Sequence, residues 1–308
     1  MSGWARFAHR FTQYYREAPL WTPPRLRSRE WMFIPFGNGK PLRHKSFSDM
    51  NSVRQFLCER PQHSCFYSTA YWKKPHELKM ADKDWLGADL IFDLDGDHLP
   101  GVTDKDFPAM IEVIQEQAWS LWNDFLVADF GFKEEYLQVT FSGHRGFHLH
   151  YRDPKFFHLN SESRRELVSH IRGEGVEVAD LMDRSRNPNS KGWARRVGLG
   201  ISSVVEKLGQ INSGDNKLLK TMTAEVKEML IREGKKGHRG KASVEKLAEL
   251  MEDKGRKERV LSGNLRGLNN YGQLFKDLIR ADTSVVLGNA GETDEVVTID
   301  TRRQIRWP

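Results

Sequence analysis

Residues 88–97 have the sequence ADLIFDLDGD, in which an apolar run ends in three closely spaced aspartates. Such a run predicts a packed strand, and alternate side chains of a strand share a face. Asp93 and Asp95 should therefore point together, away from the core, and Gly96 lets the backbone turn. Two close carboxylates repel each other unless a hard cation such as Mg²⁺ or Mn²⁺ lies between them. The motif predicts a metal site at a sheet end, although alone it also fits a plain Asp-Gly turn.

Residues 140–151, TFSGHRGFHLHY, predict two strands joined by a glycine-rich turn. The glycines permit positive φ and expose backbone N–H groups to an anion. Ser142 and His148 add hydrogen-bond donors, and Arg145 adds a forked cation suited to phosphate oxygens. Alone, the segment also fits a β-hairpin with a polar tip. Beside the paired aspartates, it predicts a metal–triphosphate site.

The two segments FDLDGDH (92–98) and SGHRGFH (142–148) begin about 50 residues apart. In this order they resemble motifs of the catalytic (small) subunit of archaeal and eukaryotic DNA primases, the archaeo-eukaryotic primase superfamily. REW (29–31), RHKSF (43–47) and TDEVVTIDTRRQIRWP (293–308) extend the resemblance over most of the chain, with an archaeal-like character.

The resemblance implies a role for eight residues. Two divalent ions, Mg²⁺ or Mn²⁺, would be bound by the catalytic aspartates Asp93, Asp95 and Asp294. The nucleotide would be held by Ser142, Arg145, His148 and Arg306, with Arg43 beside the nucleotide or the initiating phosphate. Glu30 falls on a glutamate of the family. Asp300 is an alternative third ligand, although its spacing to Arg306 fits the motif less well.

The implied activity is that of a DNA-dependent nucleotidyltransferase, which makes short primers de novo on single-stranded DNA from nucleoside triphosphates. The family's large, iron–sulfur subunit is the expected heterodimer partner. Two alternatives stay open: a primer-dependent end-joining or gap-filling polymerase of the ligase D type, and a non-catalytic nucleic-acid-binding subunit. The ligase D module normally has Lys where this chain has Arg145, which favours the primase. A calcium loop at DLDGD would lack the distal glutamate of an EF-hand.

The sequence departs from the family pattern in two places. Family members commonly carry a zinc module between the first two motifs, but residues 98–139 contain no cysteine, so we expect no structural zinc. The family pattern also continues past the point where this chain stops, at Pro308, so we expect a truncated chain or a divergent terminus. Cys58 and Cys65 are expected to be buried free thiols.

Composition agrees with a globular protein, and the order of the expected strands and helices indicates the α+β class. Of 308 residues, 38% are hydrophobic and 29% are charged, and the net charge is +6. Neither a membrane span nor a signal peptide is apparent, so we expect an intracellular protein without a membrane partner, cytoplasmic if archaeal and nuclear if eukaryotic. We expect a mixed β-sheet primase core, residues 1–199 and 261–308, with a basic, mostly helical subdomain inserted at 200–260.

Hydrophobic periodicity predicts the individual elements. Helices are expected at 4–17, at 48–60 with Ser48 or Asp49 as N-cap, at 105–130 and at 160–172. Strands are expected at 29–35, 43–47, 64–72, 88–97, 136–143, 146–153, 285–289 and 295–303. We expect Trp4, Trp31, Trp72 and Trp85 in the core, because they lie in periodic or apolar contexts.

Overall fold

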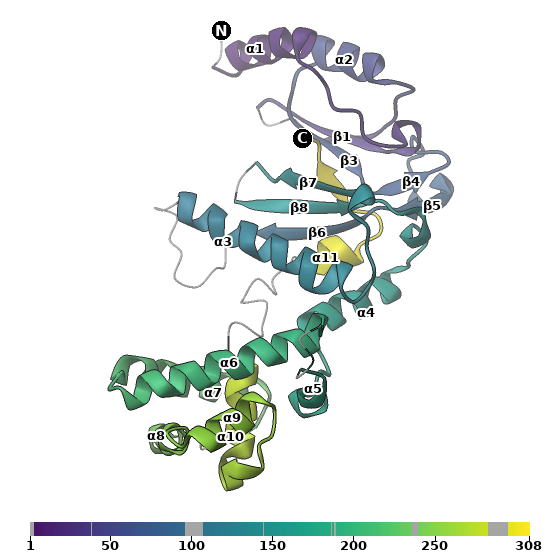
Figure 1. Cartoon of the computed structure of the whole chain (residues 1–308). Coiled ribbons are helices and arrows are strands. Elements are labelled where there is room, and N and C mark those ends of the chain that lie inside the picture. The colour runs from purple at the N-terminus through teal and green to yellow at the C-terminus, as the bar shows by residue number, and fades with distance from the viewer. Residues whose placement is uncertain are drawn as a thin grey trace.

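Three antiparallel sheets form the centre of the computed structural model, which describes residues 3–37, 39–95, 107–143, 145–185, 187, 189–235, 240–282 and 295–308 (Figure 1). Their orders are β2-β1-β3-β9, β4-β5 and β6-β8-β7. The strands are β1 (Trp31–Pro35), β2 (Leu42–Lys45), β3 (Gln62–Ser68), β4 (Ala70–Trp72), β5 (Trp85–Ala88), β6 (Leu90–Asp95), β7 (Leu137–Phe141), β8 (Gly146–Tyr151) and β9 (Gln304–Arg306).

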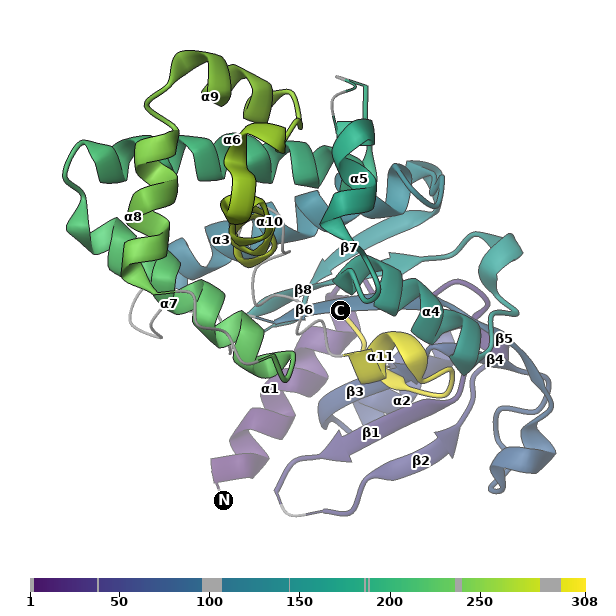
Figure 2. The ribbon, with the colours of Figure 1, turned by 90° about the horizontal axis from the view of Figure 1, so that it is seen from below.

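Helices cover the sheets from opposite sides. Helices α1 and α2 lie over the β1–β3 side, α3 and α11 lie under β6, and α6 to α10 gather beyond them (Figures 1 and 2). Together with the strands, they confirm the α+β class. The helices are α1 (Gly3–Glu17), α2 (Met50–Glu59), α3 (Phe107–Ser120), α4 (Ser161–Arg172), α5 (Val178–Ser185), α6 (Gly192–Asn212), α7 (Asn216–Arg232), α8 (Lys241–Leu250), α9 (Lys254–Leu261), α10 (Gly272–Ala281) and α11 (Glu295–Ile299).

Side-chain caps explain where several helices begin. Asp49 accepts a hydrogen bond from the Ser52 N–H at the start of α2, as the sequence predicts. Asn160 caps α4 in the same way, and Gly173 ends that helix with a φ of 71°, a left-handed conformation that favours glycine. These caps satisfy backbone groups that have no partner inside the helix.

The two larger apolar cores among the described residues lie on the two sides of the strands. In β6, Leu90, Phe92 and Leu94 enter a core that continues through α3 into α6, α7, α8 and α10. Ile91 points the other way, into a second core with Trp31 and the helices α1 and α2. The alternation leaves the remaining positions of β6 for polar groups.

The C-terminal segment differs from the sequence prediction. The strand expected at 295–303 is wrong: residues 295–299 form α11, and a turn leads into β9. Its β-branched residues favour a strand, but tertiary contacts decide the outcome. The Thr298 hydroxyl donates to the Ile91 carbonyl at 2.7 Å, and Arg164 donates to the Thr298 carbonyl. The strand expected at 285–289 lies outside the described residues.

Three further predictions concern the strand at 64–72, the tryptophans and the cysteines. The strand expected at 64–72 is two strands, β3 and β4, because the chain leaves its sheet at Thr69. Trp31 and Trp72 are buried as expected and Trp85 is half-buried, but Trp4 is 51% exposed, so its core assignment is wrong. Both cysteines are free thiols as expected, but only Cys65 is buried and Cys58 is half-buried.

The helical part of the chain is continuous with the rest. Its helices share one apolar core with the β6-β8-β7 sheet, from α5 through α10. The boundaries expected for an insertion, 200 and 260, stay a prediction. Among the described residues, no helix combines the length and the apolar character of a membrane span.

Candidate active site

Strand β6 presents Asp93 on the face opposite its core residues. Phe92 and Leu94 are buried on one side, and the Asp93 side chain, 20% exposed, lies on the other. Asp95 is the next residue on the Asp93 face by strand alternation, and its backbone pairs with Gly146. The Asp95 side chain and the whole of Asp294 lie outside the described part of the chain.

Strand β8 places a histidine directly across from Asp93. The antiparallel register pairs Asp93 with His148, and the two side chains meet at 3.3 Å between Oδ1 and Nε2. On its other side, His148 pairs with Thr140 of β7. The register therefore brings the two sequence motifs together as expected.

The turn between β7 and β8 is closed by Ser142. Its N–H donates to the Gly146 carbonyl at 2.9 Å, and its hydroxyl oxygen accepts from the Gly146 N–H at 3.1 Å. Gly143 has a φ of 82°, which a residue with a Cβ rarely adopts. Arg145 leaves this turn half-buried, and His144 is outside the described residues. The turn is thus a tightly bonded loop that carries a cation.

Strand β9 brings a second arginine to this turn from another sheet. A Cβ placed on Gly143 would lie 3.7 Å from Arg306 Nη1, at ordinary van der Waals distance, so the guanidinium lies against this turn. Arg306 is exposed, and its guanidinium carbon lies 5.9 Å from the centre of the Phe66 ring, its partner in the β3–β9 register. Residues about 160 positions apart in the sequence therefore line one site.

Arg43 lies elsewhere on that sheet. It is on β2, at the opposite edge from β9, and its guanidinium lies 3.6 Å from the buried Glu30 carboxylate. Lys83 and His44 also approach Glu30, at 3.4 and 3.3 Å, and burial lowers the pKa of each. The structure gives Arg43 no contact with Asp93 or His148 among its described interactions, so its role in nucleotide binding stays a prediction.

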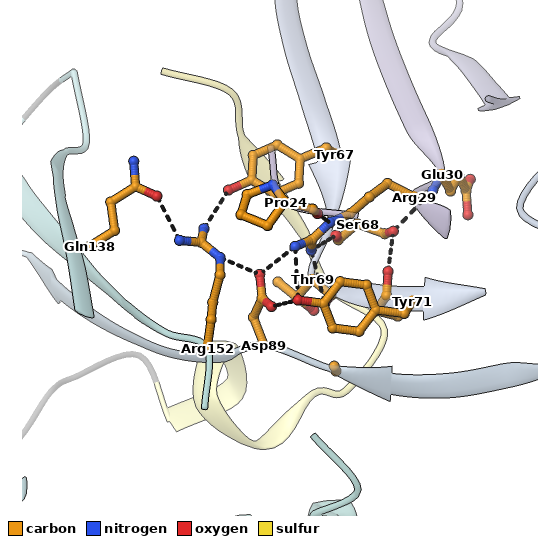
Figure 3. A network of polar contacts seen from close by, with 12 residues as sticks. Pro24, Arg29, Glu30, Tyr67, Ser68, Thr69, Tyr71, Asp89, Gln138 and Arg152 are labelled. Carbon is orange, nitrogen blue, oxygen red and sulfur yellow. Dashed lines mark hydrogen bonds and ion pairs between the residues drawn. The ribbon is translucent and has the colours of Figure 1, made fainter. Parts of the chain in front are cut away.

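A buried polar cluster, which the sequence analysis missed, lies at the start of β6. Asp89 is fully buried and accepts from Arg29 at 2.8 Å, from Arg152 at 3.1 Å and from the Tyr71 hydroxyl (Figure 3). We call Asp89, Arg29, Tyr71 and Arg152 the Asp89 cluster. Asp89 belongs to the same alternating series as Asp93, and that alternation is the signal that could have found it.

The Asp89 cluster ties the two larger sheets together. Arg152, just after β8, also donates to Gln138 of β7 at 2.6 Å and to the Tyr67 hydroxyl of β3 at 3.4 Å (Figure 3). Arg29, just before β1, donates to the Ser68 and Thr69 carbonyls after β3. These bonds fix the sheet that carries Arg306 relative to the sheet that carries Asp93 and His148.

His150 lies between this cluster and Asp93 on the same face of the sheet. It is almost completely buried, and its Nε2 lies 3.1 Å from the Thr140 hydroxyl. Burial, and then the neighbouring Arg152 and His148, hold the pKa of His150 well below its ordinary value. His150 is therefore neutral at physiological pH, unlike the arginines around it.

Among the three expected metal ligands, the structure describes the side chain of Asp93, and this side chain suits a divalent cation. The Asp93 carboxylate supplies the hard oxygen ligands that Mg²⁺ and Mn²⁺ prefer, and it is partly exposed. Within the described residues, no three acidic, histidine or cysteine side chains are grouped to hold a metal ion. Two of the three expected ligands, the Asp95 side chain and Asp294, are outside those residues, so the complete metal site stays a prediction.

Comparison with known proteins is consistent with this arrangement. Residues 92–308 match the family model described as DNA primase small subunit. The chain is 33% identical to the DNA primase small subunit PriS of Methanocella arvoryzae, over 97% of this chain and 77% of that protein. It is also 33% identical to the PriS of Haloarcula marismortui, over 97% and 76% respectively. The PriS of Halobacterium salinarum is 36% identical over 70% of this chain and 58% of that protein.

Proposed function

The chain belongs to the DNA primase small subunit family, and we propose on this basis that it synthesises short primers on single-stranded DNA from nucleoside triphosphates. It is a nucleotidyltransferase. The reaction joins the 3′-hydroxyl of one nucleotide to the α-phosphate of the next and releases pyrophosphate.

One observation of the structure supports this function most strongly. A carboxylate, Asp93, lies directly opposite His148, and the adjoining turn meets Arg306 from a second sheet. Nucleotidyl transfer requires carboxylates for divalent ions beside cationic donors for a triphosphate. The arrangement brings both types of group to one end of the β6-β8-β7 sheet.

Each described residue has a defined task in this proposal. Arg145 and Arg306 would bind triphosphate oxygens with forked, charge-assisted hydrogen bonds. Ser142 shapes the turn that presents Arg145. His148 lies beside Asp93, and we propose that it also binds a phosphate oxygen. These donors would stabilise the charge that develops on the leaving pyrophosphate.

Asp93, Asp95 and Asp294 would hold two Mg²⁺ or Mn²⁺ ions. When bound, the ions would lower the pKa of the attacking hydroxyl and neutralise the leaving group. Asp93 is oriented by its contact with His148, which keeps one carboxylate oxygen at a fixed place on β6.

The proposal includes two macromolecular partners. The template is single-stranded DNA, bound mainly through its phosphates and hence in a salt-sensitive way. The second partner is the primase large subunit, with which the chain would form a heterodimer. Primer synthesis by the small subunit alone and with the large subunit would show how far activity depends on that partner.

Primer synthesis on an unprimed single-stranded homopolymer, with labelled nucleotides and Mg²⁺ or Mn²⁺, tests the proposed function. Wild-type protein should give short products, and the Asp93→Ala, Asp95→Ala double variant should give none. The surface variant Asp84→Asn is the matched control, because Asp84 is 51% exposed and pairs only loosely with Lys74, at 3.9 Å.

Two results would overturn the proposal. Extension of a supplied primer without synthesis on the unprimed template, even with the large subunit present, would indicate a polymerase of the ligase D type. Products that persist in the double variant would place the chemistry away from Asp93 and Asp95.

A further inference from the structure

Helix α1 exposes large aromatic side chains to solvent. Trp4, Phe7 and Tyr14 are 51%, 57% and 60% exposed. Phe7 and Tyr14 are seven residues apart, so they lie on one side of the helix about 10 Å apart along its axis. Aromatic surface in contact with water is costly, and several such rings on one helix indicate a binding surface.

The orientation of α1 is fixed by other residues. Tyr15 is buried against the sheet, and Phe11 packs beside it. Arg54 of α2 donates to the carbonyls of Tyr15, Arg16 and Ala18, which satisfies the C-terminal end of the helix. Phe7 and Tyr14 therefore do not lie on the face that attaches α1 to the protein, whereas Trp4 packs against Phe36 and His63.

The charge of α1 indicates what the rings would contact. The helix carries Arg6, Arg10 and Arg16, all exposed, and its single acidic residue is Glu17. Arg10 lies between Phe7 and Tyr14 along the helix. Aromatic rings alternating with arginines are typical of surfaces that bind single-stranded nucleic acid, because bases stack on the rings and phosphates pair with the cations.

This surface continues toward the candidate active site. A cavity of about 210 Å³ is lined by Tyr14 of α1, by Ser64 of β3 and by Arg306 and Trp307 at the C-terminal end. Arg306 also lies against Gly143 in the turn that carries Arg145. The same cavity thus connects the last exposed ring of α1 to the proposed triphosphate site.

We propose that α1 binds single-stranded DNA, with bases stacked on Phe7 and Tyr14 and a phosphate paired with Arg10. The strand would leave the active site past Arg306 and cross α1. This inference rests on the proposed function for the identity of the strand as template. The expected ligand is a polyanion with exposed bases. The excess of arginines on α1 favours such a ligand over a partner protein with an apolar surface.

Anisotropy of a labelled oligothymidylate, titrated with the protein, tests this surface. The Phe7→Ala, Tyr14→Ala double variant should raise the Kd about tenfold or more, since each lost stack weakens binding several-fold. Arg10→Glu should also raise the Kd and reduce its dependence on salt. Trp119→Ala is the matched control, because Trp119 is 71% exposed on α3, and it should leave the Kd unchanged. Urea unfolding of each variant checks that the fold is retained.

The outcomes separate this inference from the proposed function. Weaker DNA binding by the α1 variants supports the inference even if the wild-type protein makes no primers, in which case only the proposed function fails. Unchanged affinity in the folded variants overturns it. If the α1 variants bind DNA normally but break a dimer seen by sedimentation, or lose the large subunit, the surface is a protein interface and the inference is wrong.

Discussion

The polar face of the β6-β8-β7 sheet carries charged groups at both ends, and the two ends are built differently. At the start of β6, Asp89 is fully buried and its carboxylate is bonded to Arg29, Arg152 and Tyr71. Four residues later, on the same face of the strand, Asp93 is partly exposed beside His148, and Arg306 nearby faces solvent.

This difference distinguishes a charged residue that stabilises the fold from a charged residue that binds a ligand. A buried carboxylate is stable only when the protein itself supplies its counter-charges, as around Asp89. Arg145 and Arg306 lie at the accessible end of the face, where a triphosphate can supply counter-charge from solution. Residue type alone does not distinguish the two ends. Burial distinguishes them, and so does the source of the counter-charge, which is the protein at one end and a ligand at the other.

Loss of the Asp89 charge is expected to give the largest effect on stability. Asp89→Asn leaves the fully buried Arg29 and the largely buried Arg152 beside an uncharged side chain. Removal of one member of such a buried set costs about 3–5 kcal/mol. Urea unfolding should show this decrease in the free energy of unfolding, while Asp84→Asn changes it little. A decrease below about 1 kcal/mol would mean that the cluster does not hold the sheets together.

Removal of Arg306 should affect nucleotide binding and not stability. Its side chain is exposed, and the pairing of β9 with β3 uses the backbone. Loss of a charge-assisted hydrogen bond should raise the KM for nucleotides about tenfold to a hundredfold in Arg306→Ala. Arg302→Ala, at an exposed residue in the preceding turn, is the control. An equal increase in KM for both variants would mean that the loss of positive charge in general weakens nucleotide binding. It would contradict a specific nucleotide-binding role for Arg306.

The neutral His150 between the two ends should make stability depend on pH. The pKa of His150 is lowered by burial and by Arg152 and His148, so below about pH 6.5 the unfolded chain binds a proton that the folded protein does not. The contribution of the neutral His150 to the free energy of unfolding is thus complete above that pH. It is lost as the pH falls, by at most about 1.4 kcal/mol per pH unit.

Comparison with His150→Gln isolates this effect. Urea unfolding at a series of pH values should show the stability of wild type falling toward that of the variant as the solution is acidified. The opposite trend, in which wild type gains relative stability in acid, would mean that His150 is charged in the folded protein.

Local sequence patterns predicted the elements that carry the site. Alternation identified β6 and the placement of Asp93, and the glycine-rich segment identified the turn at 142–146. The Asp49 cap was also predictable, because it depends on residues three positions apart. These features are set by neighbours in the chain.

Features that depend on distant partners were not predictable. Alternation places Asp89 on the polar face of its strand, but it does not show that Asp89 pairs with Arg152, 63 residues away. The β-branched residues of α11 favour a strand in the sequence. The segment is nevertheless helical, and its Thr298 hydroxyl donates to the Ile91 carbonyl of β6, a contact that the sequence does not show. In α1, the spacing of the aromatic residues was correct for a helix, but it did not show which of them would be buried.

The rate of nucleotide incorporation per folded molecule, compared between Asp93→Asn and Asp89→Asn, tests the contrast between the two ends most directly. Both substitutions remove one carboxylate charge from the same face of the sheet. We predict that folded Asp93→Asn loses roughly a thousandfold in rate or more, whereas the folded fraction of Asp89→Asn keeps a rate close to wild type. Similar losses in both, or a larger loss in Asp89→Asn, would contradict the assignment of chemistry to one end and structure to the other.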